Sequence, residues 1–562
     1  RRRHGMRDTA GRPARNGVPH RVHPGGGCPP PGPVGTFHEE VQHPMYALSV
    51  LLAFMPVIAI FVLLLVYRVA ADTAGYIGWA VAAAIAWLYF DTAPTVILLS
   101  SVAGLVASLP IALVMSASIL QITVMQETGA VSRVVALMKS VAPGQQAVQI
   151  MLINVGFGIL LTSLGAVTVS ILPPIMLALG YSTFAAIILP ALGYDALCTY
   201  ALLGIPAVVY ANFVGLPVTE VGGYFARFMP AISTCIALGM LYLAGGTKMV
   251  REGIVPALIA GLTAGVVAIL MAKLGLVTIT GIAAGLAVIA ALMLYIRLTG
   301  RPLRDRSLLN DADLAAERRH SLAAACSPWI ILTVVSLVLN APFLPFFDLT
   351  FKQWSMPLEI IPKSPERLRI FWQAYFWVLV CTAAALPLMK ATRQQVSTAL
   401  VKAGKRAGRP FMSASVFFAI AYVMNHSGKG ADWSLAQPLH NMVYVMADAS
   451  ASLFGKMYPF VAPYLGLLGG FISGSESSSI AMLTKLHLST AEKIGASGLV
   501  IAAASGIGGG LASVISPAKL QNAAASIDRI REASQAIRPA FVISVLITTV
   551  CAVMTLFWAF PN

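Results

Sequence analysis

Long, sparsely charged apolar runs constrain the fold of this chain more than any other feature. Residues 45–66, 71–90, 254–274, 276–298 and 539–560 each reach the roughly 18 residues that cross a bilayer as a helix. Inside a bilayer the backbone must satisfy its own hydrogen bonds, and none of these runs alternates in polarity like a barrel strand. The sequence therefore predicts an all-α polytopic membrane protein with about 12–14 transmembrane helices.

The charge of the chain fits a membrane protein better than a nucleic-acid-binding one. Only 11% of the residues are charged, whereas a soluble domain has about 25%. The net charge of +16 comes from Lys and Arg gathered in short loops between apolar runs, as in cytoplasmic loops. The 6 cysteines are scattered without a metal-binding spacing. We therefore expect no nucleic-acid partner, no cofactor and no bound metal.

Residues 1–44 differ in composition from everything that follows. They are rich in Arg, Pro and Gly and lack apolar periodicity, so they have no means to build a core or a span. We expect a disordered basic tail that is not part of the native protein, with Met45 as the true start. A genuine basic tail is the alternative.

A polar stretch near the middle of the chain divides it into two halves. Four arginines between Arg297 and Arg319 make it the longest basic loop, so we interpret residues 298–327 as a cytoplasmic linker. We expect the first transmembrane half at residues 45–297 and the second at residues 328–562.

Two short stretches echo each other across these halves. VMQETG at residues 124–129 and VMNHSG at residues 423–428 each close a long apolar run. The first run leads into a basic loop, whereas the second follows one, at residues 390–409. This change of side predicts two repeats that are inverted in the membrane, as in many secondary transporters.

Small, polar stretches also interrupt an apolar segment in each half. They are LTSLGA at residues 161–166 and ISGSES at residues 472–477. Glycine and serine permit a helix break, and the freed N–H groups at a helix N-terminus form a site for a carboxylate. We expect re-entrant or broken helices here; close packing of helices through small residues is the alternative. The candidate substrate-binding residues of these stretches are Thr162, Ser163, Ser475, Ser477 and Ser478.

Ionisable residues at membrane depth are costly and mark transport paths. Glu476 lies inside the second polar stretch, and Asp195 lies within another apolar run. Glu127 and His426 hold corresponding places in the two echoes and are candidates for a proton relay. We predict that these four residues carry or tune a coupling proton. For Glu127 and His426 the alternative is a helix-end residue at the membrane interface.

Two further residues are candidates for contact with an anion. Lys519 follows the predicted helix break at Ser516 and Pro517, and its ammonium group would offset a negative charge. Tyr194 directly precedes Asp195. We add Lys519 and Tyr194 to the predicted substrate-binding residues.

Three motifs resemble those of the lactate permeases. YLGLLGGFISGSESS at residues 464–478 is the most specific. AAASG at residues 502–506 with ISP at 515–517, and LGIP at 203–206, are similar to further family motifs. The resemblance extends from Met45 to the C-terminus. It implies proton-driven uptake of lactate or a similar short 2-hydroxymonocarboxylate across the cytoplasmic membrane. It also implies inverted repeats with re-entrant hairpins.

The chain departs from the family pattern at candidate binding positions. Thr162 and Ser163 stand where the family usually has Glu-Gly, and Tyr194 and Asp195 replace an Asn-Thr. His426 replaces the Tyr of an Asn-Tyr-Ser-Gly. A sodium-coupled carrier or one for another organic anion is therefore the alternative function. An integral-membrane enzyme is a more remote alternative, because the sequence shows no nucleophile–base set or metal motif.

Overall fold

The computed structural model describes residues 44–67, 69–166, 168–341, 344–512, 514–527, 529 and 533–560. The predicted basic tail, except for Pro44, lies outside these described residues. The chain divides into a unit that ends at Leu48 and a main unit that begins at Ser49. All the candidate site residues belong to the main unit.

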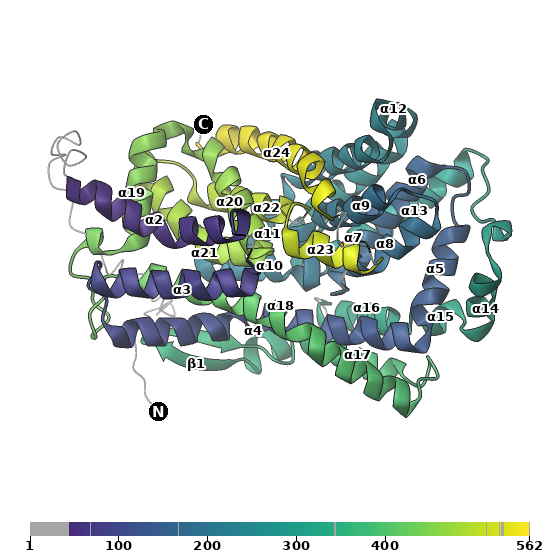
Figure 1. Ribbon diagram of the computed structural model, residues 1–562, viewed down its shortest axis with the longest axis horizontal. Helices are drawn as coiled ribbons and strands as arrows, with labels where there is room; N and C mark the ends of the chain where they lie inside the picture. Colours follow the sequence, from purple (N-terminus) through teal and green to yellow (C-terminus); the bar gives the residue numbers. More distant parts are fainter. Residues whose placement is uncertain are drawn as a thin grey trace, which may run out of the picture. The chain divides into compact units, whose positions relative to one another are not determined.

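The prediction of an all-α membrane fold is confirmed (Figure 1). The elements up to residue 298 are α2 (Pro44–Leu65), α3 (Ala71–Leu88), α4 (Pro94–Thr128), α5 (Ala130–Ser140), α6 (Gln146–Ile150), η1 (Met151–Phe157), α7 (Gly158–Ser163), α8 (Thr168–Ala178), α9 (Thr183–Asp195), η2 (Cys198–Tyr200), α10 (Ala201–Val214), α11 (Val218–Ala226), α12 (Met229–Lys273), η3 (Val277–Ile279) and α13 (Thr280–Leu298).

The remaining elements include a β-hairpin that the sequence did not predict. They are η4 (Arg306–Leu308), α14 (Asp311–Arg319), α15 (Leu322–Ala325), α16 (Ser327–Leu339), η5 (Asp348–Gln353), β1 (Met356–Ile361), β2 (Ser364–Leu368), α17 (Ala374–Ala385), α18 (Arg393–His426), η6 (Pro438–His440), α19 (Met442–Phe454), η7 (Gly455–Met457), α20 (Tyr458–Ser473), α21 (Glu476–Ile494), α22 (Gly498–Leu511), α23 (Pro517–Ala525) and α24 (Ala533–Trp558). The strands β1 and β2 pair antiparallel.

Breaks divide several of the apolar runs into helices shorter than a bilayer crossing. Of the described helices, 7 are long and apolar enough to span a membrane without interruption. The number of spans rises to 8 if α9 and the following η2–α10 segment, which are bent by 69° relative to each other, are counted together as one span. Uninterrupted spans are therefore fewer than the predicted helices, because the polar breaks interrupt apolar runs that the sequence presents as continuous.

Helices from before and after residue 298 pack on one another. The long helices α4 and α18 lie along each other, α3 packs on α18, and α17 packs on α4 (Figure 1). Farther along the chain, α10 packs on α21, while α23 packs on α8 and α9. Each half thus supplies part of the surroundings of the other.

The structure places helix breaks at both polar stretches where the sequence predicts them. In the first half α7 ends at Ser163 and α8 begins at Thr168. In the second half Gly474 is left-handed, with φ of 68°, and Ser475 caps α21 by accepting the Ser478 N–H at 3.4 Å. Glycine permits this conformation without a steric penalty, so the sequence ISGSES stops one helix and starts the next.

A second break follows in each half. After α9, the residues Leu202, Leu203 and Gly204 have φ values of 54°, 59° and 73°. After α22, the chain turns before Ser516, and Pro517 takes the first position of α23. Left-handed leucines are sterically costly, so surrounding contacts must hold the first of these breaks in place.

Glycines bring α20 and α22 into backbone contact. A Cβ added at Gly466, Gly470 or Gly508 would overlap backbone atoms of the facing helix. Such close approach through small residues is a common way to join membrane helices. The alternative interpretation of the small residues, close packing, therefore explains the glycines that precede the break at Gly474.

We predict that Gly470→Val sharply lowers the yield of folded protein, because the new side chain would displace the Gly509 carbonyl. Gly404→Val is the matched control, since nothing lies within 4 Å of that position. Size-exclusion chromatography of detergent-extracted protein measures both. Equal monodisperse yields of the two variants would contradict this packing.

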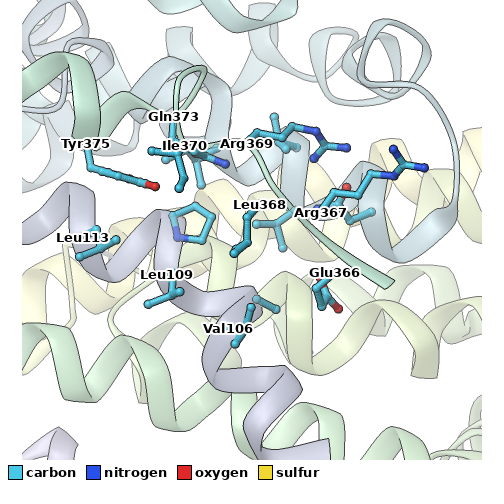
Figure 2. A pocket seen from close by; sticks show the side chains of 16 residues that line it. Val106, Leu109, Leu113, Glu366, Arg367, Leu368, Arg369, Ile370, Gln373 and Tyr375 are labelled. Atoms are coloured by element: carbon cyan, nitrogen blue, oxygen red, sulfur yellow. The ribbon is translucent and has the colours of Figure 1, made fainter. Parts of the chain in front are cut away.

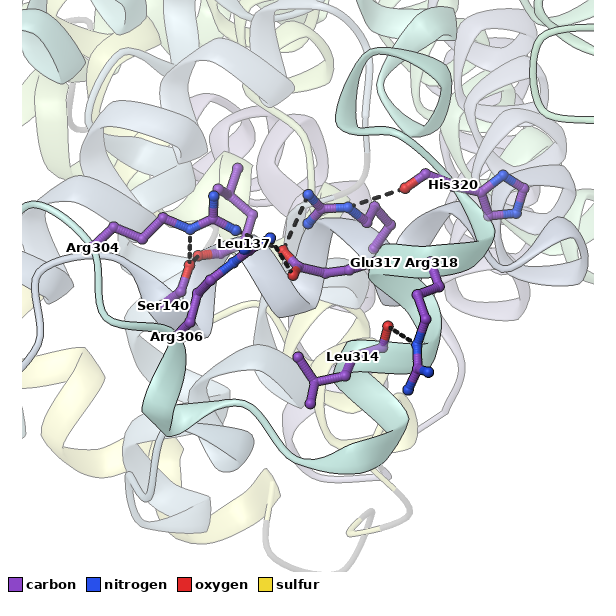
Figure 3. A network of polar contacts seen from close by, with 9 residues as sticks. Leu137, Ser140, Arg304, Arg306, Leu314, Glu317, Arg318 and His320 are labelled. Atoms are coloured by element: carbon purple, nitrogen blue, oxygen red, sulfur yellow. Dashed lines mark hydrogen bonds and ion pairs between the residues drawn. The ribbon is translucent and has the colours of Figure 1, made fainter.

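The segment predicted to be a linker loop contains a short helix, α14, that is joined to α5 by ion pairs (Figure 3). The carboxylate of Glu317 forms ion pairs with Arg133 at 3.2 Å, Arg304 at 2.6 Å and Arg306 at 3.0 Å. Arg133 Nε also donates to the His320 carbonyl at 3.1 Å. The linker is therefore an ordered part of the described chain.

We predict that Glu317→Gln destabilises the protein more than Arg306→Gln does. The Arg133 side chain is 9% exposed, and loss of its partner leaves a buried charge, at a cost of about 3–5 kcal/mol. The Arg306 side chain is 67% exposed, and such surface pairs contribute about 0–1 kcal/mol. Thermal unfolding in detergent measures both. A smaller shift for Glu317→Gln would contradict the assignment.

Candidate functional site

Glu476 joins two helix breaks from opposite halves of the chain. It is the first residue of α21, directly after the break at Gly474, and only 3% of its surface is exposed. Its Oε1 atom accepts a hydrogen bond from Thr199 Oγ1 at 2.5 Å. Thr199 lies in η2, inside the bend between α9 and α10. The two breaks are thus held together by one buried hydrogen bond.

The other carboxyl oxygen of Glu476 has different surroundings. Its Oε2 atom has no hydrogen-bond partner within the described part of the chain. It faces Gly510 of α22, where an added Cβ would lie 2.8 Å from Oε2 and 3.2 Å from Cys198 Cβ. Glycine at this position leaves the space that the carboxyl group occupies. A buried acceptor without a donor costs about 1–3 kcal/mol, so we regard this atom as a candidate position for a further hydrogen-bond partner.

Asp195 and Lys519 extend the same group of residues. Asp195 is 4% exposed, and its Oδ2 atom accepts the Val514 N–H at 3.3 Å, from the break between α22 and α23. Lys519 Nζ lies 3.7 Å from the centroid of the Tyr194 ring. Lys519 also interacts electrostatically with Asp195 and Glu476. We refer to these residues as the break cluster: Tyr194, Asp195, Thr199, Glu476 and Lys519.

The charges of the break cluster do not balance by themselves. It contains the carboxyl groups of Asp195 and Glu476 and the single ammonium group of Lys519. With all three ionised the cluster carries a negative charge in a buried place, and one added proton makes it neutral. In the described chain no group of His, Cys, Asp and Glu has the arrangement of a metal site.

The predicted serines surround the start of α21. Ser475 caps the helix through its bond with the Ser478 N–H, and Ser477 is 4% exposed. The Ser478 hydroxyl is buried without a hydrogen-bond partner among the described residues. Ser516 Oγ lies 3.1 Å from the position of a Cβ at Gly474, so the second break of this half adjoins the first. Hydroxyls and N–H groups therefore lie directly beside Glu476.

Thr162 and Ser163 have partners within the first half instead. The Thr162 hydroxyl bonds to Thr168 Oγ1 at 3.2 Å, across the break between α7 and α8. Ser163 Oγ donates to the Ile159 carbonyl at 2.7 Å and abuts Gly281 of α13. These hydrogen bonds hold the break between α7 and α8 to neighbouring helices of the first half.

Glu127 and His426 lie at helix ends, apart from the break cluster. Glu127 Oε1 pairs with Lys402 Nζ at 2.6 Å, and the two side chains are 23% and 48% exposed. His426 Nδ1 lies 2.9 Å from the Tyr422 carbonyl oxygen, and its ring meets Trp433 edge-on at 5.6 Å. These surroundings are those of the helix-end alternative.

Sequence reasoning missed Thr199, Cys198 and Gly510. Threonine and cysteine are common in apolar runs, so nothing in the sequence distinguishes them. Their importance comes from the bend after α9, which turns η2 toward α21.

We predict that Thr199→Val destabilises the protein by about 1–3 kcal/mol, because Oε1 of the buried Glu476 carboxyl group loses the hydrogen bond that Thr199 Oγ1 donates. Thr333→Val is the matched control, since Thr333 Oγ1 bonds only within its own helix, to the Trp329 carbonyl. The double variant with Glu476→Gln should be non-additive by about 0.5–3 kcal/mol. Additive effects on the thermal unfolding would contradict direct coupling.

Known sequences are similar to this chain over nearly its whole length. A sequence model of the L-lactate permease family matches residues 49–560. Glycolate permease of Escherichia coli is 25% identical over 91% of this chain and 96% of its own length. L-lactate permease of Salmonella typhimurium is 24% identical over 91% and 96%. L-lactate permease of Bacillus subtilis is 23% identical over 85% and 90%.

Proposed function

We propose, because this chain belongs to the L-lactate permease family, that it carries lactate or a similar short 2-hydroxymonocarboxylate together with protons. The chain is a multi-pass transporter of the inner membrane and not an enzyme. The relatives named for L-lactate and for glycolate support a small 2-hydroxy acid as the substrate.

The proposal of proton coupling rests on the surroundings of the Glu476 carboxyl group. It is a buried carboxyl group with one oxygen bonded to Thr199 and the other without a donor within the described chain. It also shares Lys519 with Asp195. A proton on this cluster cancels its excess negative charge, which otherwise opposes the approach of an anion. Binding of a proton and of an anion therefore favour each other.

The surroundings of Glu476 also suit the substrate. A 2-hydroxycarboxylate presents a carboxylate and, one carbon away, a hydroxyl group. The N–H groups at the start of α21, the Ser478 hydroxyl and the ammonium group of Lys519 are suitable partners for the carboxylate. The carboxyl groups of Asp195 and Glu476 are suitable acceptors for the hydroxyl.

The exchange of helix partners supports the predicted inverted repeats. The packing of α3 on α18 corresponds to that of α17 on α4, and the packing of α10 on α21 corresponds to that of α23 on α8. A two-fold relation between residues 45–297 and 328–562 produces such pairs. In carriers of this kind the substrate site lies where the broken helices of the two repeats meet. The break cluster has this position between the halves.

We predict that Glu476→Gln abolishes accumulation of labelled L-lactate driven by a pH gradient in proteoliposomes, while lactate–lactate exchange remains measurable. The amide cannot release or accept the coupling proton, yet it fills the same space beside Gly510. Glu127→Gln is the matched control, because that carboxylate is paired with Lys402 outside the break cluster.

Two outcomes would reject the proposal. Undiminished pH-driven accumulation in Glu476→Gln would remove this residue from coupling. Accumulation that follows a sodium gradient and ignores the pH gradient would favour the sodium-coupled alternative. Competition by glycolate, pyruvate, acetate and dicarboxylates then ranks the anions.

A further inference from the structure

We propose that a cavity beneath the β1–β2 hairpin is a second site for the transported carboxylate, which the anion occupies on its way to the break cluster. The inference rests on the proposed function. The cavity lies between the hairpin, α4 and α10 and has a volume of about 210 Å³ (Figure 2). One water needs about 10–15 Å³ by the same kind of measure, so a small organic anion fits.

The floor of the cavity adjoins the helix breaks of the first half. Ile205, which lines the cavity, directly follows the left-handed residues that end at Gly204. Leu113 lines it from α4 and lies one and a half turns, about 7.5 Å, from Ser118. Ser118 Oγ is 3.2 Å from the position of a Cβ at Gly165, in the break between α7 and α8. The cavity wall therefore adjoins the break that ends at Gly204.

One buried polar atom in the cavity wall has no hydrogen-bond partner in the described part of the chain. Gln373 is 4% exposed, and its Oε1 atom has no hydrogen-bond partner among the described residues. Gln373 precedes α17, but its side chain does not cap that helix. The hydroxyl group of Tyr375 points into the cavity (Figure 2), and Asn212 lines it at an exposed position. The Tyr375 hydroxyl is a suitable donor to a carboxylate, and Gln373 Oε1 is a suitable acceptor for the neighbouring hydroxyl.

The rest of the wall is apolar and suits the carbon atoms of the ligand. It includes Leu109 and Pro110 of α4, and Val208 and Val209 of α10. A few polar groups in a mostly apolar, concave wall are the usual features of small-molecule sites.

Two arginines make the rim of the cavity positive. Arg369 is held by its Nε bond to the Phe351 carbonyl, at 3.2 Å, and by that residue's ring, 4.2 Å from the guanidinium. Burial, and next the charge of Arg367, lower the pKa of Arg369 to about 10, so it remains a cation at neutral pH. Both guanidinium groups lie to one side of the cavity (Figure 2). A charged rim of this kind raises the local concentration of anions.

Glu366 fixes the hairpin over the cavity. Its carboxyl group accepts a hydrogen bond from the Tyr422 hydroxyl of α18. Burial raises the pKa of Glu366, although the Tyr422 bond and then Arg369 act in the opposite direction. The carboxyl group is thus occupied by a protein donor, and the arginines dominate the charge of the rim.

The test uses a thiol reporter, Asn212→Cys, in the full chain. We expect L-lactate to slow its reaction with an anionic methanethiosulfonate, by about tenfold at ten times the dissociation constant. Lys363→Cys, at the exposed hairpin turn outside the cavity, should react at a rate that lactate does not change. The chain without an introduced cysteine measures the background of the native thiols.

A second substitution locates the ligand in the cavity. Gln373→Leu in the Asn212→Cys background should abolish the protection by lactate, because the amide that contacts the anion is gone. This variant removes a buried acceptor without a partner, so it should fold at least as well as its parent. Protection that persists unchanged in Gln373→Leu would overturn the site.

Transport measurements on the same preparations separate this inference from the proposed function. Protection of the reporter without any lactate transport would reject the proposed function and retain the cavity as an anion site. Transport of lactate without protection would reject the cavity and retain the function. We expect both lactate transport and protection of the reporter in the otherwise unchanged chain. Protection should also persist in Glu476→Gln, because the cavity does not include the break cluster.

Discussion

A helix that breaks inside a bilayer must find partners for the polar groups that the break exposes, and the rest of this structure depends on how that is done. Polar groups at the breaks of one half find some of their hydrogen-bond partners in the other half. Asp195 accepts the Val514 N–H, and Thr199 donates to Glu476, each across more than 270 positions of the sequence. The same breaks that would be unstable alone therefore become a buried polar site between the halves.

This dependence explains how the site responds to charge. Asp195, Glu476 and Lys519 are brought together by contacts that the breaks require, and their charges do not cancel. In the function that we propose, a proton and an anion change that sum in opposite directions, so the binding of each favours the binding of the other. The cavity under the β1–β2 hairpin suits the same anion, because its arginines attract negative charge and its floor adjoins the breaks. Both places therefore fit the single substrate class that we propose.

Much of the fold and part of the site could be predicted from the sequence. Apolar runs and the stretch ISGSES locate the helices and the break at Gly474, because length and local backbone freedom decide them. Tyr194, Asp195, Glu476 and Lys519 stand out as polar residues in apolar runs, and the structure brings them together. Thr199 does not stand out, because its role depends on a bend of 69°. The bond between Glu127 and Lys402 joins α4 to α18 and likewise depends on tertiary packing.

The central claim is that the break cluster takes up a proton when it binds the anion. The most direct measurement is the proton uptake of the purified protein in weakly buffered detergent solution when L-lactate is added near neutral pH, read with a pH-sensitive dye. The account predicts uptake by the wild-type protein that increases with lactate occupancy and disappears in Glu476→Gln. Lactate binding without proton uptake, or an unchanged signal in Glu476→Gln, would contradict it.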